Sequence, residues 1–197
     1  MTEEAVTLRE TVLAFARRFS FEEEHALQDE RLALSVFDET RRLGLHAHDA
    51  GARQVLSYAA LLHDIGYSAG YEEHHKTSFR LILAEPIPGM EPRARLLVAH
   101  VARFHRGSLP DPSRHSSFAA LPEEDQRVVT QLGAILRFAD GLDRTHTNAV
   151  ADVRCSLQEG RLVVTLSPGA SDEMERWAGQ KKARWFEAVF GVKVELG

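Results

Sequence analysis

Histidine and aspartate residues recur in the helical stretches of this sequence, and these residue types bind metals and move protons. The chain contains ten histidines, several of them in apolar segments rather than on polar faces. Imidazole and carboxylate ligands together suit a divalent transition metal better than calcium. The candidate ligands are His25, His63, Asp64, His75, His100, His105 and Asp140.

Separate helices are predicted to carry these side chains. Helical periodicity indicates helices over about 3–19, 21–43, 52–65, 75–84, 91–105 and 122–142. Ser20 followed by Glu23 predicts a capping box, Gly66 is expected to end the helix that carries His63 and Asp64, and Pro122 suits the first turn of the last helix. A long polar loop is expected over 106–122. A helix bundle can bring such side chains to one interior point.

The sequence period changes after residue 149. Alternating apolar residues predict a hairpin over 150–166, Ser171 is expected to cap a helix to about Phe190, and "VKVEL" reads as a final strand. The predicted fold is therefore mainly α, with a small ββαβ tail. We expect a helical metal-binding domain over 1–148 and a C-terminal subdomain over 149–197 packed on it.

Composition excludes several classes of protein. The net charge of −5 argues against duplex DNA or RNA as a partner, and we find no apolar run long enough for a membrane span. The single cysteine, Cys155, fits a reducing compartment, and the N-terminus lacks the form of a signal peptide, so we expect a cytoplasmic protein. A homodimer through the apolar tail remains open.

Five ordered sequence blocks carry a resemblance to a known family. They are "EEEHALQDERLALSVFD", "YAALLHDIG", "HHKTSFRLI", "LVAHVARFHRG" and "ILRFADGLDRTH". The order His25, His63-Asp64, Asp140 resembles the H…HD…D signature of HD-superfamily metal-dependent phosphohydrolases. The chain is most similar to the HD-like C-terminal domain of the exopolyphosphatase/guanosine-pentaphosphate phosphatase (Ppx/GppA) family, and the segment "RWFEAVFGVKVEL" resembles that family's end. The resemblance implies an HD-domain helical bundle.

The resemblance also implies a ligand set. The first metal would be held by His25, His63, Asp64 and Asp140, with His75 and His105 completing a second and Asp64 bridging. His63 and Asp64 would also be the catalytic residues. Each chain would hold one or two divalent transition-metal ions, which could be manganese, iron, zinc, cobalt or nickel, with magnesium as an alternative. Asp29 stands where the family pattern has an apolar residue, so we expect it to be an extra ligand or a hydrogen-bond partner of one.

Positive side chains near these ligands are candidates for phosphate binding. They are Lys76, Arg103, Arg106 and Arg144. Arginine suits phosphate because its planar fork binds two oxygens, although cations at helix ends are also ordinary solvated groups. Among the remaining candidates we expect His100 in the core, His74 on the surface, and Trp177, Trp185 and Phe186 in the core of the tail.

These features predict a phosphohydrolase, either a phosphatase or a phosphodiesterase. Its substrate would be a nucleotide or another small phosphate ester or anhydride, cleaved at a His/Asp site with one or two metals. The actin-like catalytic domains that precede this region in exopolyphosphatases are not in this sequence, so we expect any chemistry to come from the helical domain. The alternative is a non-catalytic module that binds or senses (p)ppGpp or polyphosphate. Cyclic-nucleotide phosphodiesterase activity is a third reading.

Overall fold

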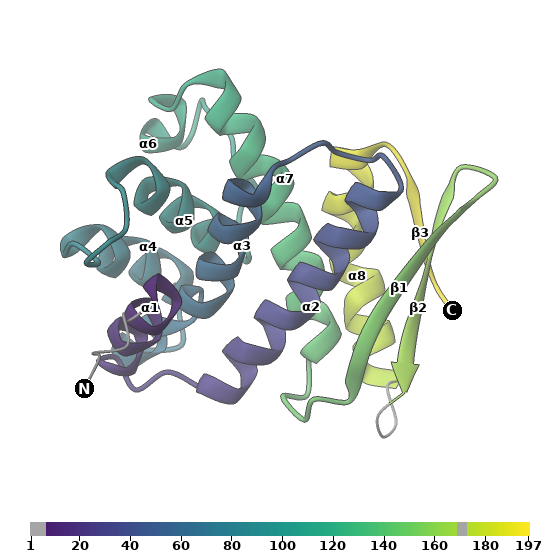
Figure 1. Cartoon of the computed structure of the whole chain (residues 1–197), viewed down its shortest axis with the longest axis horizontal. Coiled ribbons are helices and arrows are strands. Elements are labelled where there is room, and N and C mark those ends of the chain that lie inside the picture. The colour runs from purple at the N-terminus through teal and green to yellow at the C-terminus, as the bar shows by residue number, and fades with distance from the viewer. Residues whose placement is uncertain (1–6, 169–172) are drawn as a thin grey trace, which may run out of the picture.

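The computed structural model describes residues 7–168 and 173–197, and it confirms the predicted mainly α fold with a small C-terminal sheet (Figure 1). No helix in these two ranges is long and apolar enough to cross a membrane. The helical elements are α1 (Leu8–Arg17), α2 (Glu23–Arg42), α3 (Ala50–Leu62), the 3-10 helix η1 (Ile65–Ala69), α4 (His74–Ala84), α5 (Pro92–Phe104), α6 (Ser116–Ala119), α7 (Glu123–Asp140), the 3-10 helix η2 (Gly141–Asp143) and α8 (Glu173–Phe190). The strands are β1 (Val150–Gln158), β2 (Arg161–Pro168) and β3 (Lys193–Leu196).

Helix α3 lies at the centre of the helical body because its second half is mostly apolar and is buried on every side. All of its residues from Val55 to Leu62 are buried, and the helix contacts α1, α2, α5 and α7. A helix that is hydrophobic all round has to be covered by neighbours. The end of α3 therefore lies inside the bundle, and His63 and Asp64 follow it there.

The tail is a three-stranded sheet with one crossover helix. Strands β1 and β2 are antiparallel, with Cys155 opposite Val164, and β3 runs parallel to β2, with Val194 opposite Leu162. Helix α8 connects β2 to β3 and packs against α7, while β1 packs on α2 (Figure 1). One hydrophobic core runs through both parts, so the division into 1–148 and 149–197 stays a prediction.

Several predicted boundaries differ from the structure. The expected capping box at Ser20 is wrong, because Glu22 is the N-cap of α2 and Ser20 lies outside the helix with φ of +50°. A capping box does open α1, where Thr7 and Glu10 bond reciprocally. The predicted loop over 106–122 contains the short helix α6. The expected cap Ser171 lies outside the described residues.

Gly66 has a different role from the one that we expected. Helix α3 ends earlier, at Leu62, and Gly66 lies within η1. A Cβ atom at Gly66 would lie 2.1 Å from the carbonyl oxygen of His74 and 2.7 Å from the backbone nitrogen of Ser78. The Gly66 N–H also donates to Ser78 Oγ at 2.9 Å. The glycine therefore allows the first turn of α4 to pack directly on the segment that follows Asp64.

Replacing Gly66 tests this close approach. We expect Gly66→Ala to destabilise the protein by about 3 kcal/mol, because the new methyl group overlaps backbone atoms that cannot move independently. The matched substitution Gly51→Ala, in the first turn of α3, places its Cβ 3.3 Å from the Asp49 side chain. It should change stability by about 1 kcal/mol or less. Urea denaturation of both variants measures the difference, and equal stabilities would contradict the packing role.

Candidate metal centre

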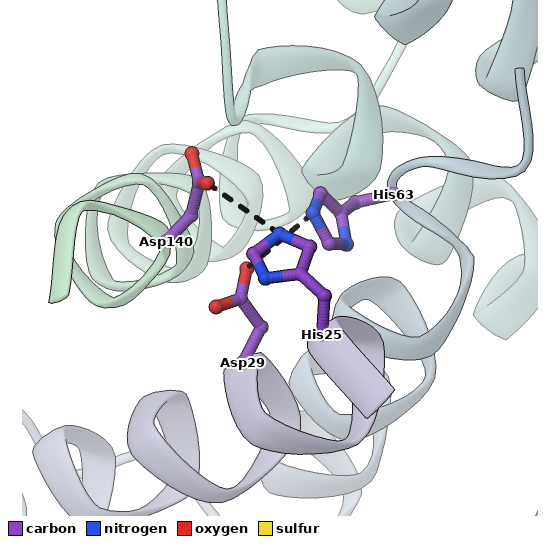
Figure 2. Close-up of side chains that lie close together, drawn as sticks. All are labelled: His25, Asp29, His63 and Asp140. Carbon is purple, nitrogen blue, oxygen red and sulfur yellow. Dashed lines mark ion pairs between the residues drawn. The ribbon is translucent and has the colours of Figure 1, made fainter. Parts of the chain in front are cut away.

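Three helices direct imidazole and carboxylate groups to one interior point, as Figure 2 shows. His25 and Asp29 lie one turn apart on α2, His63 follows α3, and Asp140 is the last residue of α7. One ligand atom from each of these four residues lies within 4.8 Å of the others. His63 Nε2 is 3.4 Å from Asp29 Oδ2, and His25 Nε2 is 3.9 Å from Asp140 Oδ1.

A second group shares Asp64 with the first. Asp64 Oδ2 faces the first group, at 3.4 Å from His63 Nε2 and 3.9 Å from His25 Nε2. Asp64 Oδ1 faces the other way, at 3.2 Å from His74 Nε2 and 3.4 Å from His105 Nε2. The two oxygens of one carboxylate therefore belong to two adjacent sets of ligand atoms.

Hydrogen bonds fix how the imidazole rings are oriented. The Nδ1–H groups of His63, His74 and His105 donate to the carbonyl oxygens three residues before them, at 2.7, 2.9 and 2.6 Å. His25 Nδ1–H donates to the Asp143 carboxylate at 2.8 Å. In the neutral form of each ring, this pattern directs the Nε2 lone pair at the centre, which is how metal-binding histidines are held by their second nitrogen.

Several of the inward-facing atoms are buried and have no hydrogen-bond partner among the described residues: both Asp29 carboxylate oxygens, Asp64 Oδ1 and His63 Nε2. In addition, His74 Nε2 and His105 Nε2 face each other at 3.3 Å. Buried charges are stable when they are paired or coordinate a metal. The donor set therefore fits a cation at each of the two groups.

The electrostatics of the centre follow from burial opposed by many close charges. Burial lowers the pKa of both His63 and His105, so these imidazoles are neutral and suited to ligation. At Asp64 the effect of burial is outweighed by His63, His74 and His105, which lower the pKa of this carboxyl. Asp64 is therefore ionised at neutral pH, as a bridging ligand needs to be.

The centre opens into a cavity of about 510 Å³. Asp64, His74, His105 and Asp140 form its floor, and helix α8 supplies much of its wall. The basic residues that line the cavity are Arg106, Arg137, Arg144, Lys181, Lys182 and Arg184. The carboxylates and imidazoles of the centre lie next to these basic side chains. The cavity therefore suits an anionic ligand that contacts both the centre and the basic residues.

In the structure His74, rather than the expected His75, lies in the second ligand group. His74, expected on the surface, is only 1% exposed and lies against Asp64, while His75 points toward Gly107 and Arg103. His105 lies where we expected it, beside Asp64. The local packing of α4 explains this placement. His74 is the first residue of α4 and faces η1, where the Tyr67 ring stacks on the His74 ring at 4.0 Å.

The phosphate-binding candidates divide into two pairs. Arg106 and Arg144 line the cavity, whereas Lys76 and Arg103 are not among its described lining residues. Lys76 instead forms an ion pair with Glu73, and the Arg103 guanidinium lies over the Phe104 ring at 5.5 Å. Lys76 lies two residues after His74 on α4, and Arg103 lies on α5 two residues before His105, the C-cap of that helix, so neighbouring ligands do not bring these two side chains to the described lining of the cavity.

A family model described as Ppx/GppA phosphatase, domain III, matches residues 8–174 of this chain. The chain belongs to this family. The Ppx/GppA name denotes phosphatases, a class of hydrolase, and the match includes every residue of the two ligand groups. It ends at the start of α8, so the basic residues of α8 that line the cavity lie beyond the matched range.

Sequence reasoning missed several residues of this Ppx/GppA domain III site. Asp143, which is fully buried, orients His25, and Lys182 forms an ion pair with Asp140 across 42 residues. Asp143 follows Asp140 by one helical turn, which was a signal available in the sequence. The Lys182 contact gave no signal in the sequence, because it depends on a close approach between Gly141 and Gly179. A Cβ atom at Gly141 would lie 3.0 Å from the Cα atom of Gly179.

The tail aromatics also differ in their roles. Phe186 and Trp185 are buried, as expected for core residues. Trp177, expected in the core, is 57% exposed and lines the cavity, where the Lys181 ammonium lies 5.0 Å from the centre of its ring. The expectation for Trp177 is therefore wrong, because this residue lies on the face of α8 that borders the cavity rather than the sheet.

Paired histidine variants test the second ligand group. We expect His74→Ala to lower metal content from about two divalent cations per chain to about one, because it removes an imidazole whose Nε2 contacts Asp64. His75→Ala should keep the content of the wild-type protein. Elemental analysis after dialysis against manganese gives both values. The placement of His74 is contradicted when His75→Ala, rather than His74→Ala, loses the cation.

Proposed function

We propose that this Ppx/GppA domain III protein is an HD-type, metal-dependent phosphohydrolase with a two-cation centre. The observation that carries the proposal is the division of the Asp64 carboxylate, whose Oδ2 lies 3.4 Å from His63 Nε2 and whose Oδ1 lies 3.2 Å and 3.4 Å from Nε2 of His74 and His105. The first cation would be held by His25, His63, Asp64 and Asp140. The second would be held by Asp64, His74 and His105.

Divalent cations bound at such a centre supply an acidified water and neutralise charge on the phosphoryl group. The protein residues hold the centre in place for this chemistry. Asp143 and the carbonyl oxygen of Ala60 keep Nε2 of His25 and His63 directed inward. Lys182 neutralises one oxygen of Asp140 while the other faces His25. In catalysis, His63 and Asp64 are proposed to act as ligands of the cations that would contact the reacting phosphoryl group.

The cavity cations would bind the remaining phosphate oxygens. Arg106 and Arg144 offer planar forks at the cavity wall, and Lys181 and Arg184 add charge from α8. Burial and the nearby Asp64 carboxylate raise the pKa of Tyr67 to about 12, so its phenol stays protonated and can donate a hydrogen bond to phosphate. The substrate is therefore proposed to be a small phosphate ester or anhydride.

We propose a nucleotide as the specific form of that substrate. Trp177 offers an exposed aromatic face at the edge of the cationic wall, and a planar base stacks favourably on such a ring. The alternative function is a non-catalytic domain that binds guanosine polyphosphates or polyphosphate through the same cations. The two readings differ in whether Asp64 is needed for turnover or only for binding.

The replacement Asp64→Asn tests catalysis directly. We expect turnover of p-nitrophenyl phosphate or bis-p-nitrophenyl phosphate, with manganese supplied, to fall by about 100-fold or more, because the amide leaves one nitrogen in place of a bridging oxygen. The control is Asp38→Asn, an exposed change at a residue that pairs with Arg53, and it should keep wild-type turnover. A metal-loaded wild-type protein that hydrolyses neither ester, nor a nucleoside triphosphate, would favour the binding module.

The cationic wall predicts a separate effect on substrate affinity. We expect Arg144→Gln and Lys181→Gln each to raise KM by about 10-fold with a smaller change in kcat, because each removes a charge-assisted contact to phosphate. Arg161→Gln provides the control, since Arg161 lies on β2 and pairs with Glu195. Steady-state kinetics on a nucleoside triphosphate measures the effect, and an unchanged KM in both cavity variants would contradict this wall as the binding surface.

A further inference from the structure

We infer that Asp29 is a fifth protein ligand of the first cation, in addition to His25, His63, Asp64 and Asp140. The inference rests on the metal centre of the proposed function and extends it to a residue outside the H…HD…D motif. It also assigns the first position an oxygen-rich ligand set, with two imidazoles and three carboxylates. That set favours a cation of higher coordination number, such as Mn²⁺ or Fe²⁺, over four-coordinate zinc.

The position of Asp29 matches that of the other ligands. The residue lies one turn after His25 on α2 and its side chain is fully buried (Figure 2). Its Oδ2 atom is 3.6 Å from His25 Nε2 and 3.4 Å from His63 Nε2. Ligand atoms bonded to one ion at ~2.1 Å lie ~3 to 4.2 Å apart. Asp29 Oδ2 therefore meets the same distance condition as Asp64 Oδ2 and Asp140 Oδ1.

The usual structural roles of a buried aspartate do not account for Asp29. It cannot orient the imidazoles of His25 and His63 from behind, because their Nδ1–H groups already donate to Asp143 and to the Ala60 carbonyl oxygen. It does not cap a helix, since it lies within α2. Neither of its oxygens has a hydrogen-bond partner in the described ranges. The nearby ammonium of Lys182 is bonded to Asp140.

A cation between Asp29 and the two Nε2 atoms accounts for this placement. A carboxylate is an acceptor on both oxygens, and the Nε2 atoms that face it carry lone pairs in the ligating tautomer. Groups of this kind repel each other unless a positive charge lies between them. There are two rivals without a metal: a protonated Asp29 that donates to an imidazole, and a protonated His25 that forms an ion pair with Asp29 at 3.6 Å.

The variants Asp29→Leu and Asp29→Asn separate these possibilities, with the exposed Asp38→Asn on the same helix as the control. Calorimetric titration of metal-stripped protein with Mn²⁺ and Zn²⁺ measures affinity. For Asp29→Leu we expect Mn²⁺ to bind one of the two sites about 10-fold or more weakly, with a smaller loss for Zn²⁺. Asp29→Asn should lie between, because its amide oxygen can still ligate. Asp38→Asn should match the wild-type protein.

Two further readouts distinguish a ligand from a residue that only supports the ligands. Loading with Co²⁺ should give more intense visible absorption bands in Asp29→Leu than in the wild-type protein, because losing a ligand lowers the coordination number. The metal-free Asp29→Leu protein should melt at a higher temperature than the wild-type protein, since a buried carboxylate is gone, and Mn²⁺ should raise its melting temperature less.

The inference is overturned when Asp29→Leu binds Mn²⁺ with wild-type affinity and shows an unchanged Co²⁺ spectrum. If Asp29→Leu does not fold, the Mn²⁺ affinity and the Co²⁺ spectrum of Asp29→Asn test the inference instead. Wild-type protein that binds no divalent cation would overturn the metal centre of the proposed function as well. If the wild-type protein binds two cations and Asp29→Leu binds them with the same affinity, the proposed function stands and only the role of Asp29 as a ligand is rejected.

Discussion

The structure depends on one electrostatic constraint, which is that three buried aspartates, the partly exposed Asp140 and four buried histidines meet inside the helical body. The carboxylates are those of Asp29, Asp64, Asp140 and Asp143, and the described residues offer them few cations, with Lys182 on Asp140 as the closest. Leaving buried charges uncompensated costs several kcal/mol. The helical body therefore gathers carboxylates and imidazoles at a place that suits a cation.

This constraint explains why the packing around the centre is so close. Gly66 lets α4 approach η1 and bring His74 to Asp64, and Gly141 with Gly179 lets α8 approach the end of α7 and bring Lys182 to Asp140. In each case a larger residue would separate the charged groups that the site needs together. The C-terminal tail is thus a part of the cavity, since α8 supplies its cations and the exposed Trp177.

The family match and the geometry bear on different questions. The match to Ppx/GppA domain III covers α1 to the start of α8 and establishes what the chain is related to. The chemistry proposed here depends instead on the orientation of side chains, namely the inward Nε2 atoms and the divided Asp64 carboxylate. The catalytic and the binding readings share this geometry, and they differ only in what happens to a phosphate once it reaches the centre.

The sequence alone determined the mainly α fold and the ββαβ tail, because hydrophobic periodicity is a local property, while the convergence of His25, His63, Asp64, His105 and Asp140 was expected from the resemblance to the H…HD…D signature. It could not decide between His74 and His75, since adjacent helical residues differ by about 100° in direction and only the packing of α4 on Gly66 selects one. It also could not place Lys182 or Trp177 at the cavity. Those contacts join residues far apart in the chain, and they exist only because the tail folds back on the helical body.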